Sequence, residues 1–176
     1  MQKKIVITGG PGTGKTMVIN ELIKRSFICK TEISRQVTIK AREDGVDQLF
    51  LTQPLLFSEL LLKGRVKQFL DANKAEDKLI FFDRGIPDVH SYMDYLKTEY
   101  PSKYFDKSDS YRYSQVFLMP PWEEIYTSDN ERYETYEQSL EIYFHIKKAY
   151  VELGYQITEV PHGSITERTE FILNSI

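Results

Sequence analysis

A glycine-rich run occupies residues 9–16, between an apolar segment and the beginning of a predicted helix. It matches G-x-x-x-x-G-K-[ST], in which glycines let backbone amides turn inward around a polyphosphate while the helix dipole favours the anion. Lys15 can reach the β- and γ-phosphates of a nucleoside triphosphate, and the Thr16 hydroxyl can ligate Mg²⁺. The predicted nucleotide-binding residues are Gly9, Gly10, Pro11, Gly12, Thr13, Gly14, Lys15 and Thr16. We expect ATP with Mg²⁺, and GTP is the alternative because base contacts come from loops with weak signatures.

Asp83 and Arg84 follow the apolar run LIFF, which reads as a buried strand. Ligands bind beyond the carboxyl ends of parallel strands. There the Asp83 carboxylate can hold Mg²⁺ or orient an attacking hydroxyl, and its alternative role is to cap the next segment. Arg84 is predicted to clamp an anionic group or a sugar hydroxyl, and the alternative is a surface salt bridge.

Glu32 ends a second predicted strand, at residues 27–33, on the same edge of the sheet. A carboxylate beside a bound phosphate donor is where a general base for a substrate hydroxyl can sit. The alternative is a capping acid that pairs with Arg35, one turn later. The sequence does not decide whether Glu32 or Asp83 is the base.

A third cation, Arg132, lies in a segment from Glu123 to Ile146 that otherwise holds seven acidic residues. Phosphoryl transfer is faster when an arginine closes over the transferring group, by about 10³-fold or more. We therefore predict a lid at about residues 122–150 that carries Arg132 to the site. The alternative is an exposed ion pair with Asp129, which would contribute little.

Further candidates lie outside these motifs. Trp122 can stack on a nucleobase or pack in the core, and His162 follows the last predicted strand, where an adenine or a simple turn is equally compatible. Gln53 and Arg65 are minor candidates for contacts to an acceptor, because both lie on a long predicted helix at residues 52–73.

Strands and helices alternate along the chain. Apolar, β-branched runs without alternation indicate strands buried on both faces, and the stripes of apolar residues between them indicate helices. This order predicts one α/β domain, residues 1–176, with a parallel sheet between two helical layers. The expected strands are 4–8, 27–33, 78–85, 115–119 and 156–160. The expected helices are 15–26, one that Ser34 caps, 52–73, 88–100, one from a capping box of Ser128 and Glu131 to 153, and 164–176.

Composition excludes several classes of function. The formal charge of −3 gives no general attraction to nucleic acid or to anionic lipid. Apolar runs are far shorter than the roughly 18 residues that a membrane span needs, so we expect a cytoplasmic protein. The single Cys29 reads as a structural thiol rather than a catalytic one.

These segments resemble a known family. GGPGTGKT, TEISR, FFDRGIPDVHSYMDYL, VFLMPPW and DNER together are similar to the AAA-type P-loop family that includes the nicotinamide-riboside kinase domain of bifunctional NAD-salvage proteins. The resemblance implies a three-layer nucleoside-kinase-like core with strand order 2-3-1-4-5 and a helical lid around Arg132. It also implies phosphate contacts by Lys15 and a metal role for Thr16 and Asp83.

Two functions remain open at this point. The first is an ATP-dependent kinase that phosphorylates the hydroxyl of a nucleoside-like small molecule. The second is a nucleotide-dependent binding module or switch with slow hydrolysis, which a large apolar surface around residues 92–113 would favour. A nucleic-acid-dependent ATPase is disfavoured by the acidic balance. Neither the acceptor nor the oligomeric state follows from the sequence.

Overall fold

A computed structural model describes residues 2–126 and 134–176 of the chain. Its centre is a parallel sheet with the strand order β2-β3-β1-β4-β5, so the predicted order is confirmed. In register, Ile7 of β1 lies opposite Asp83 of β3, and Thr8 lies opposite Leu118 of β4. The carboxyl ends of these strands therefore meet at one edge of the sheet. The strands are β1 (Lys3–Thr8), β2 (Ile28–Lys30), β3 (Leu79–Asp83), β4 (Gln115–Leu118) and β5 (Ile157–Glu159).

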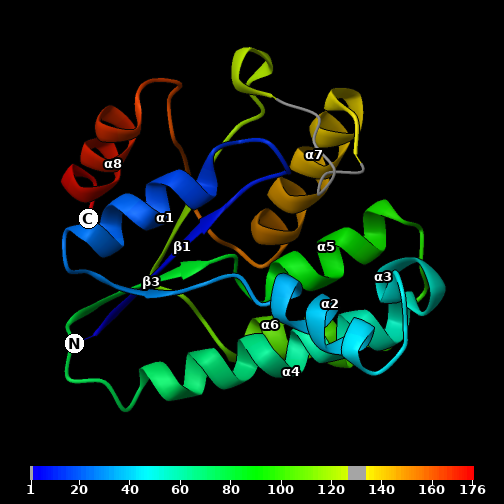
Figure 1. The fold of residues 1–176 in the computed structure, drawn as a ribbon. Helices are drawn as coiled ribbons and strands as arrows, with labels where there is room; N and C mark the ends of the chain where they lie inside the picture. Colours follow the sequence, from blue (N-terminus) through cyan, green and yellow to red (C-terminus); the bar gives the residue numbers. More distant parts are fainter. Residues whose placement is uncertain (1, 127–133) are drawn as a thin grey trace.

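Helices cover both faces of the sheet (Figure 1). Helices α1 (Lys15–Lys24) and α8 (Ile165–Asn174) pack on one face, whereas α4 (Pro54–Ala72), α5 (Pro87–Tyr95) and α7 (Tyr136–Glu152) pack on the other. The shorter elements are α2 (Ser34–Glu43), α3 (Leu49–Thr52), α6 (Lys103–Ser110) and a 3₁₀ turn, η1 (Glu123–Ile125).

The middles of the central strands are apolar because both of their faces are buried there. Alternate side chains of a strand point to opposite faces, so each strand supplies both cores. The core beneath α1 and α8 includes Ile5, Ile7, Phe81 and Phe117. The core beneath α4, α5 and α7 includes Val6, Ile80, Phe82, Val116 and Leu118.

Several helix boundaries differ from the sequence prediction, beginning with α2 and α5. Ser34 is the first residue of α2 rather than its cap, and the carboxylate of Glu32 accepts the backbone N–H groups of Ile33 and Ser34 instead. The helix predicted at residues 88–100 ends at Tyr95, after which Lys97 adopts a left-handed conformation with φ of 53°. Helix α6 was not predicted. Only Tyr104 and Ser108 of this helix are buried, so its sequence shows little of the apolar periodicity by which a helix is recognised.

Helix α7 begins later than the sequence suggested. Its capping box consists of Thr135, whose hydroxyl accepts the N–H of Gln138, and the Gln138 side chain, which accepts the N–H of Thr135. The predicted capping box, Ser128 with Glu131, lies outside the described residues. The limits of the predicted lid stay a prediction, although the second half of α7 belongs to the core, where Ile142, Ile146 and Tyr150 are fully buried.

The tyrosines of residues 92–113 direct their rings inward. Tyr104 and Tyr113 are buried in the core beneath α4 and α5, and Tyr92, Tyr95 and Tyr100 are partly buried against it. These rings therefore supply packing area rather than an exposed apolar surface. Within the part of the chain that the structure describes, none of the helices combines the length and apolar character needed to traverse a bilayer.

Replacing Thr135 by alanine tests the observed beginning of α7. The variant loses the side-chain acceptor for the Gln138 N–H, and we expect the free energy of unfolding to fall by about 1 kcal/mol. Thr135→Ser keeps the oxygen and should match the wild type. Urea denaturation measures both, and equal stability of Thr135→Ala and the wild type would place the helix start elsewhere.

Candidate active site

The phosphate-binding loop, residues 9–16, joins β1 to α1 at the carboxyl edge of the sheet. Gly12 and Gly14 have φ of 72° and 81°, a left-handed backbone that residues with a Cβ atom rarely adopt. At Gly14 a Cβ atom would also lie 2.8 Å from the guanidinium of Arg168 on α8. The loop therefore needs glycine both for its curvature and for close packing.

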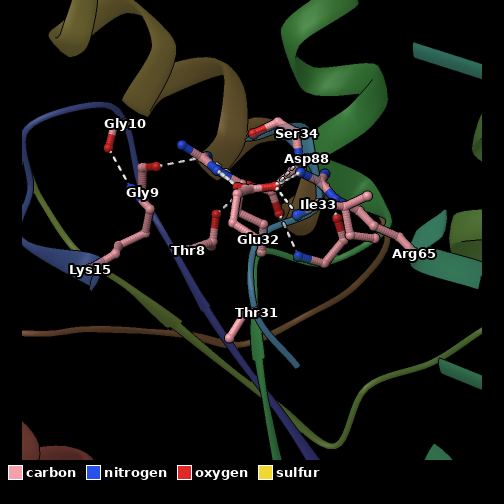
Figure 2. A network of polar contacts seen from close by, with 12 residues as sticks. Thr8, Gly9, Gly10, Lys15, Thr31, Glu32, Ile33, Ser34, Arg65 and Asp88 are labelled. Atoms are coloured by element: carbon pink, nitrogen blue, oxygen red, sulfur yellow. Dashed lines mark hydrogen bonds and ion pairs between the residues drawn. The ribbon is translucent and has the colours of Figure 1, made fainter. Parts of the chain in front are cut away.

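Lys15 points into this loop. It is buried, and its Nζ donates to the carbonyl of Gly10 at 2.6 Å and contacts the Thr13 hydroxyl at 3.3 Å (Figure 2). Burial, together with the positive charge of Arg84, lowers the pKa of Lys15 to about 7. An amine that lacks a full counter-charge in a loop of inward-facing backbone is suited to a polyanionic ligand.

Asp83 ends β3 directly beside β1, where Ile7 is its partner in register. Its carboxylate is buried, and burial raises the pKa of Asp83 while the charge of nearby Lys15 opposes that rise. Thr16 lies in the first turn of α1 and is exposed. The two side chains offer hard oxygen donors, the ligand type that Mg²⁺ prefers.

A site with one carboxylate and one hydroxyl fits a Mg²⁺ ion that takes its remaining ligands from water and substrate phosphates. The described residues contain no group of three or more His, Cys, Asp or Glu side chains placed to hold a metal ion without such help. The two oxygen donors of Asp83 and Thr16 are compatible with a metal ion that arrives with a nucleotide.

Glu32 follows β2 and is held by two arginines. Its Oε1 accepts from Arg65 Nη2 at 3.2 Å (Figure 2). Its Oε2 lies 2.6 Å from Arg84 Nε. Burial alone would raise the pKa of Glu32, but the charges of Arg65 and Arg84 and the N–H of Ser34 lower it to about 2. Glu32 therefore stays ionised, and it caps α2 as well as pairing with the arginines.

Arg84 connects Glu32 to the phosphate-binding loop. Besides its ion pair with Glu32, it donates from Nη1 to the carbonyl of Gly9 at 2.9 Å. Its backbone is left-handed, with φ of 69°, and its N–H donates to the carbonyl of Ile7. The side chain is well shielded from solvent, so the surface salt bridge considered as an alternative for Arg84 does not describe its position.

Arg132 lies outside the described residues, so its role as a lid arginine stays a prediction. The segments that flank it do contact the phosphate-binding loop. The Tyr126 ring packs against Gly12, and the Ser139 hydroxyl at the beginning of α7 donates to the carbonyl of Pro11 at 3.3 Å.

Three planar side chains gather beside the loop. The rings of Trp122 and His162 stack with centroids 4.8 Å apart and an interplanar angle of 6°. The Arg168 guanidinium lies 5.6 Å from the Trp122 ring and donates to the carbonyl of Thr13 at 2.9 Å. Trp122 and His162, the two candidates for contacts to a nucleobase, are thus adjacent. Arg168 beside them was not predicted, because it belongs to no recognisable sequence motif.

Sequence reasoning considered some residues of this cluster and missed others. Arg65, a minor candidate, is buried at the site, whereas Gln53 is an exposed residue that precedes α4. Asp88 was missed, although its position four residues after Arg84 brings the two to one side of the same turn. Tyr150 on α7 contacts Asp88 although the two are 62 positions apart, and no local sequence pattern predicts that contact.

Comparison with known proteins gives a family and a fold. The sequence profile of the AAA domain family matches residues 4–168. No curated protein matches the chain in sequence. A deoxyadenosine kinase from M. mycoides, solved with dCMP and a flexible dCDP bound, superposes with a TM-score of 0.69 at 17% identity, over 98% of this chain and 97% of that one.

Two other solved structures are similar. A thymidylate kinase from Ehrlichia chaffeensis superposes with a TM-score of 0.61 at 13% identity, over 99% of this chain and 98% of that one. NadR protein, solved with NAD and AMP-PNP, superposes with a TM-score of 0.69 at 13% identity, where the match covers 99% of this chain and 48% of NadR. The chain therefore belongs to the AAA domain family, and its fold is that of the P-loop nucleoside and nucleotide kinases.

Proposed function

We propose that this protein is an ATP- and Mg²⁺-dependent kinase that phosphorylates a hydroxyl group of a nucleoside-like small molecule. One observation carries the proposal: Arg84 joins the carboxylate of Glu32 to the carbonyl of Gly9 in the phosphate-binding loop. A carboxylate for an acceptor hydroxyl thus lies one side chain away from the place where a triphosphate would bind. This proximity supports the transfer of a phosphoryl group from the triphosphate to that hydroxyl.

The remaining roles follow from position. The backbone amides from Gly10 onward and the Lys15 ammonium hold the β- and γ-phosphates, in place of the Gly10 carbonyl that Lys15 contacts here. Thr16 and Asp83 hold Mg²⁺, which supplies positive charge to the phosphate oxygens. Arg132 lies outside the described residues and keeps its predicted role at the transferring group, and the stacked rings of Trp122 and His162 would lie beside the base.

Pairing of the arginines favours an uncharged acceptor. Arg65 and Arg84 both bind the Glu32 carboxylate, and Arg84 also faces Asp88 at 3.3 Å. An acceptor that already carries a phosphate would compete with these carboxylates and leave buried charges without partners, which costs several kcal/mol. The geometry is better suited to a nucleoside, as in the similar deoxyadenosine kinase, than to a monophosphate such as thymidylate.

Glu32 is assigned to the acceptor and Asp83 to the metal. A carboxylate with a pKa of about 2 is a weak base, but transfer through a loose transition state needs an oriented hydroxyl more than a strong base. Asp83 adjoins the phosphate-binding loop through β1, so its oxygens are better placed for Mg²⁺ than for the acceptor. The tyrosines of residues 92–113 pack inward and leave Leu96 and Phe105 as the exposed large apolar side chains there, so the switch hypothesis gains little of the apolar surface that would favour it.

A transfer assay tests the function. Labelled ATP, with GTP as a second donor, is incubated with a panel of nucleosides that includes nicotinamide riboside, with the matching 5′-monophosphates and with water alone. We expect transfer to a nucleoside above the water control, and none with Lys15→Ala, whose triphosphate binding by calorimetry should also be lost. Hydrolysis without transfer to any acceptor would contradict the kinase proposal, and transfer only to monophosphates would contradict the neutral acceptor.

Glu32→Gln separates the acceptor role from donor binding. The amide keeps the shape but loses the charge that orients the hydroxyl, so we expect kcat to fall by about 100-fold. The Kd for ATP should stay within about twofold of the wild type, because Glu32 does not contact the phosphates in this assignment. Glu59→Gln, the same change in an exposed ion pair on α4, is the control. Wild-type turnover by Glu32→Gln on an identified nucleoside would show that the assignment is wrong.

Acid titration gives a test that needs no substrate. The pKa of Glu32 is lowered from 4.5 to about 2 in the folded protein, so its pairing stabilises the fold above pH 4.5. This stabilisation, up to about 3 kcal/mol, is lost as the pH falls from 4.5 towards 2. We expect the difference in unfolding free energy between the wild type and Glu32→Gln to shrink over this range in urea denaturation. A difference that is unchanged between pH 7 and pH 3 would show that the pairing does not hold in solution.

A further inference from the structure

Asp88, in the first turn of α5, collects four donors although the sequence analysis gave it no role. It is 1% exposed. Its Oδ2 accepts from the N–H of Gly85 at 2.9 Å and from the hydroxyl of Tyr150 at 2.7 Å. Its Oδ1 accepts from the hydroxyl of Thr8 and from Arg84 Nη1 at 3.3 Å. A buried carboxylate with this many donors is held firmly in one position.

Arg84 depends on this position. Its backbone is left-handed, a conformation that costs free energy in a residue with a side chain and persists only where the surroundings enforce it. Asp88 contributes on both sides of the residue, since it binds the guanidinium of Arg84 and the N–H of Gly85, the next residue. The carboxylate therefore holds both the main chain and the side chain of the arginine that contacts Glu32 and Gly9.

Tyr150 reaches the same point from another layer. Its ring is fully buried near the end of α7, and the hydroxyl packs so closely against Gly85 that a Cβ atom there would collide with it. Gly85 is thus required by contact rather than by a left-handed backbone. Its two neighbours, Arg84 and Ile86, are consequently fixed relative to α7.

The same helix touches the phosphate-binding loop. Near its beginning, the Ser139 hydroxyl donates to the carbonyl of Pro11, and a Cβ atom at Gly10 would lie 3.0 Å from the Ser139 carbonyl. Ser139 and Tyr150 are eleven positions apart, which corresponds to a distance of about 16 Å along the helix axis. Helix α7 therefore contacts the phosphate-binding loop near its beginning and the Asp88 carboxylate, which holds Arg84, near its end.

We propose that Tyr150 and Asp88 are positioning residues for phosphoryl transfer: Tyr150 holds the Asp88 carboxylate, which holds Arg84, so that α7 sets the placement of this arginine relative to the phosphate-binding loop. The inference rests on the proposed kinase function for its kinetic part and on contacts alone for its structural part. Neither residue touches a substrate in this proposal.

Tyr150→Phe tests the inference with a single hydroxyl. We expect kcat to fall by about 10-fold, because one hydrogen bond to the buried carboxylate is lost and Arg84 becomes less well placed. The Kd for ATP should stay within about twofold. Tyr143→Phe is the matched control, since it removes a hydroxyl from the same helix, there bound to Glu159 at 2.7 Å, and should leave kcat unchanged. Asp88→Asn, which removes the charge facing Arg84, should lower kcat further than Tyr150→Phe.

A spectroscopic measurement tests the structural part of the proposal separately from its kinetic part. The Arg84 Nε–H, which lies on Glu32 Oε2 at 2.6 Å, gives a ¹⁵N–¹H signal that Arg84→Lys assigns by its disappearance. We expect Tyr150→Phe to shift this signal and to speed its exchange with water, and Tyr143→Phe to leave it in place. If the wild type phosphorylates no nucleoside, the kinase function fails while this measurement still decides the positioning. An unchanged Arg84 signal together with an unchanged kcat in Tyr150→Phe would overturn the inference.

Discussion

The pairing of Arg84 with Glu32 is the interaction on which the site depends, because it places one charge from the end of β3 against another from the end of β2. Both groups are largely removed from water, and desolvation of each is costly unless geometry and further hydrogen bonds compensate. Here they do: Arg84 also binds Gly9 and Asp88, and Glu32 also binds Arg65 and the N-terminus of α2. Removal of one partner from such a set typically lowers the free energy of unfolding by about 3–5 kcal/mol, whereas replacement of both partners by apolar residues is often neutral.

Charge balance around the loop explains why these groups can be buried together. Lys15, Arg65 and Arg84 supply three positive charges, and Glu32, Asp83 and Asp88 supply three negative ones. The two arginines form ion pairs with carboxylates of the protein, whereas Lys15 donates to the Gly10 carbonyl and has a lowered pKa. The positive charge that is least compensated thus lies in the phosphate-binding loop, where a triphosphate would neutralise it.

The parallel sheet gathers these groups. Strands β2, β3 and β1 are neighbours, so the residues that follow their carboxyl ends, Glu32, Arg84 and Gly9, lie side by side although they are distant in sequence. Helices α4, α5 and α7 then close the acceptor side with Arg65, Asp88 and Tyr150. A polar site can exist beside two apolar cores because all of its charged groups emerge at one edge of the sheet.

Amino-acid order alone determined the features whose causes are local. The phosphate-binding loop, the buried strands and the acid at the end of β3 each need particular residue types at consecutive positions, since backbone conformation and alternation are properties of short segments. The strand order was predicted from the resemblance to a family. The cap of α2 was missed because the carboxylate of Glu32, rather than the side chain next to the helix, accepts the first N–H groups. Helix α6 was missed because most of its residues are polar and give no apolar periodicity.

Only the tertiary structure decided which distant side chains meet. Arg65 reaches Glu32 across 33 positions, Tyr150 reaches Asp88 across 62, and Arg168 reaches Thr13 across 155. Such contacts depend on how helices are seated on the sheet, and this follows from the packing of the whole core rather than from any segment of it. A residue that takes its role from a partner in another layer leaves no periodicity or spacing in its own neighbourhood by which it could be found.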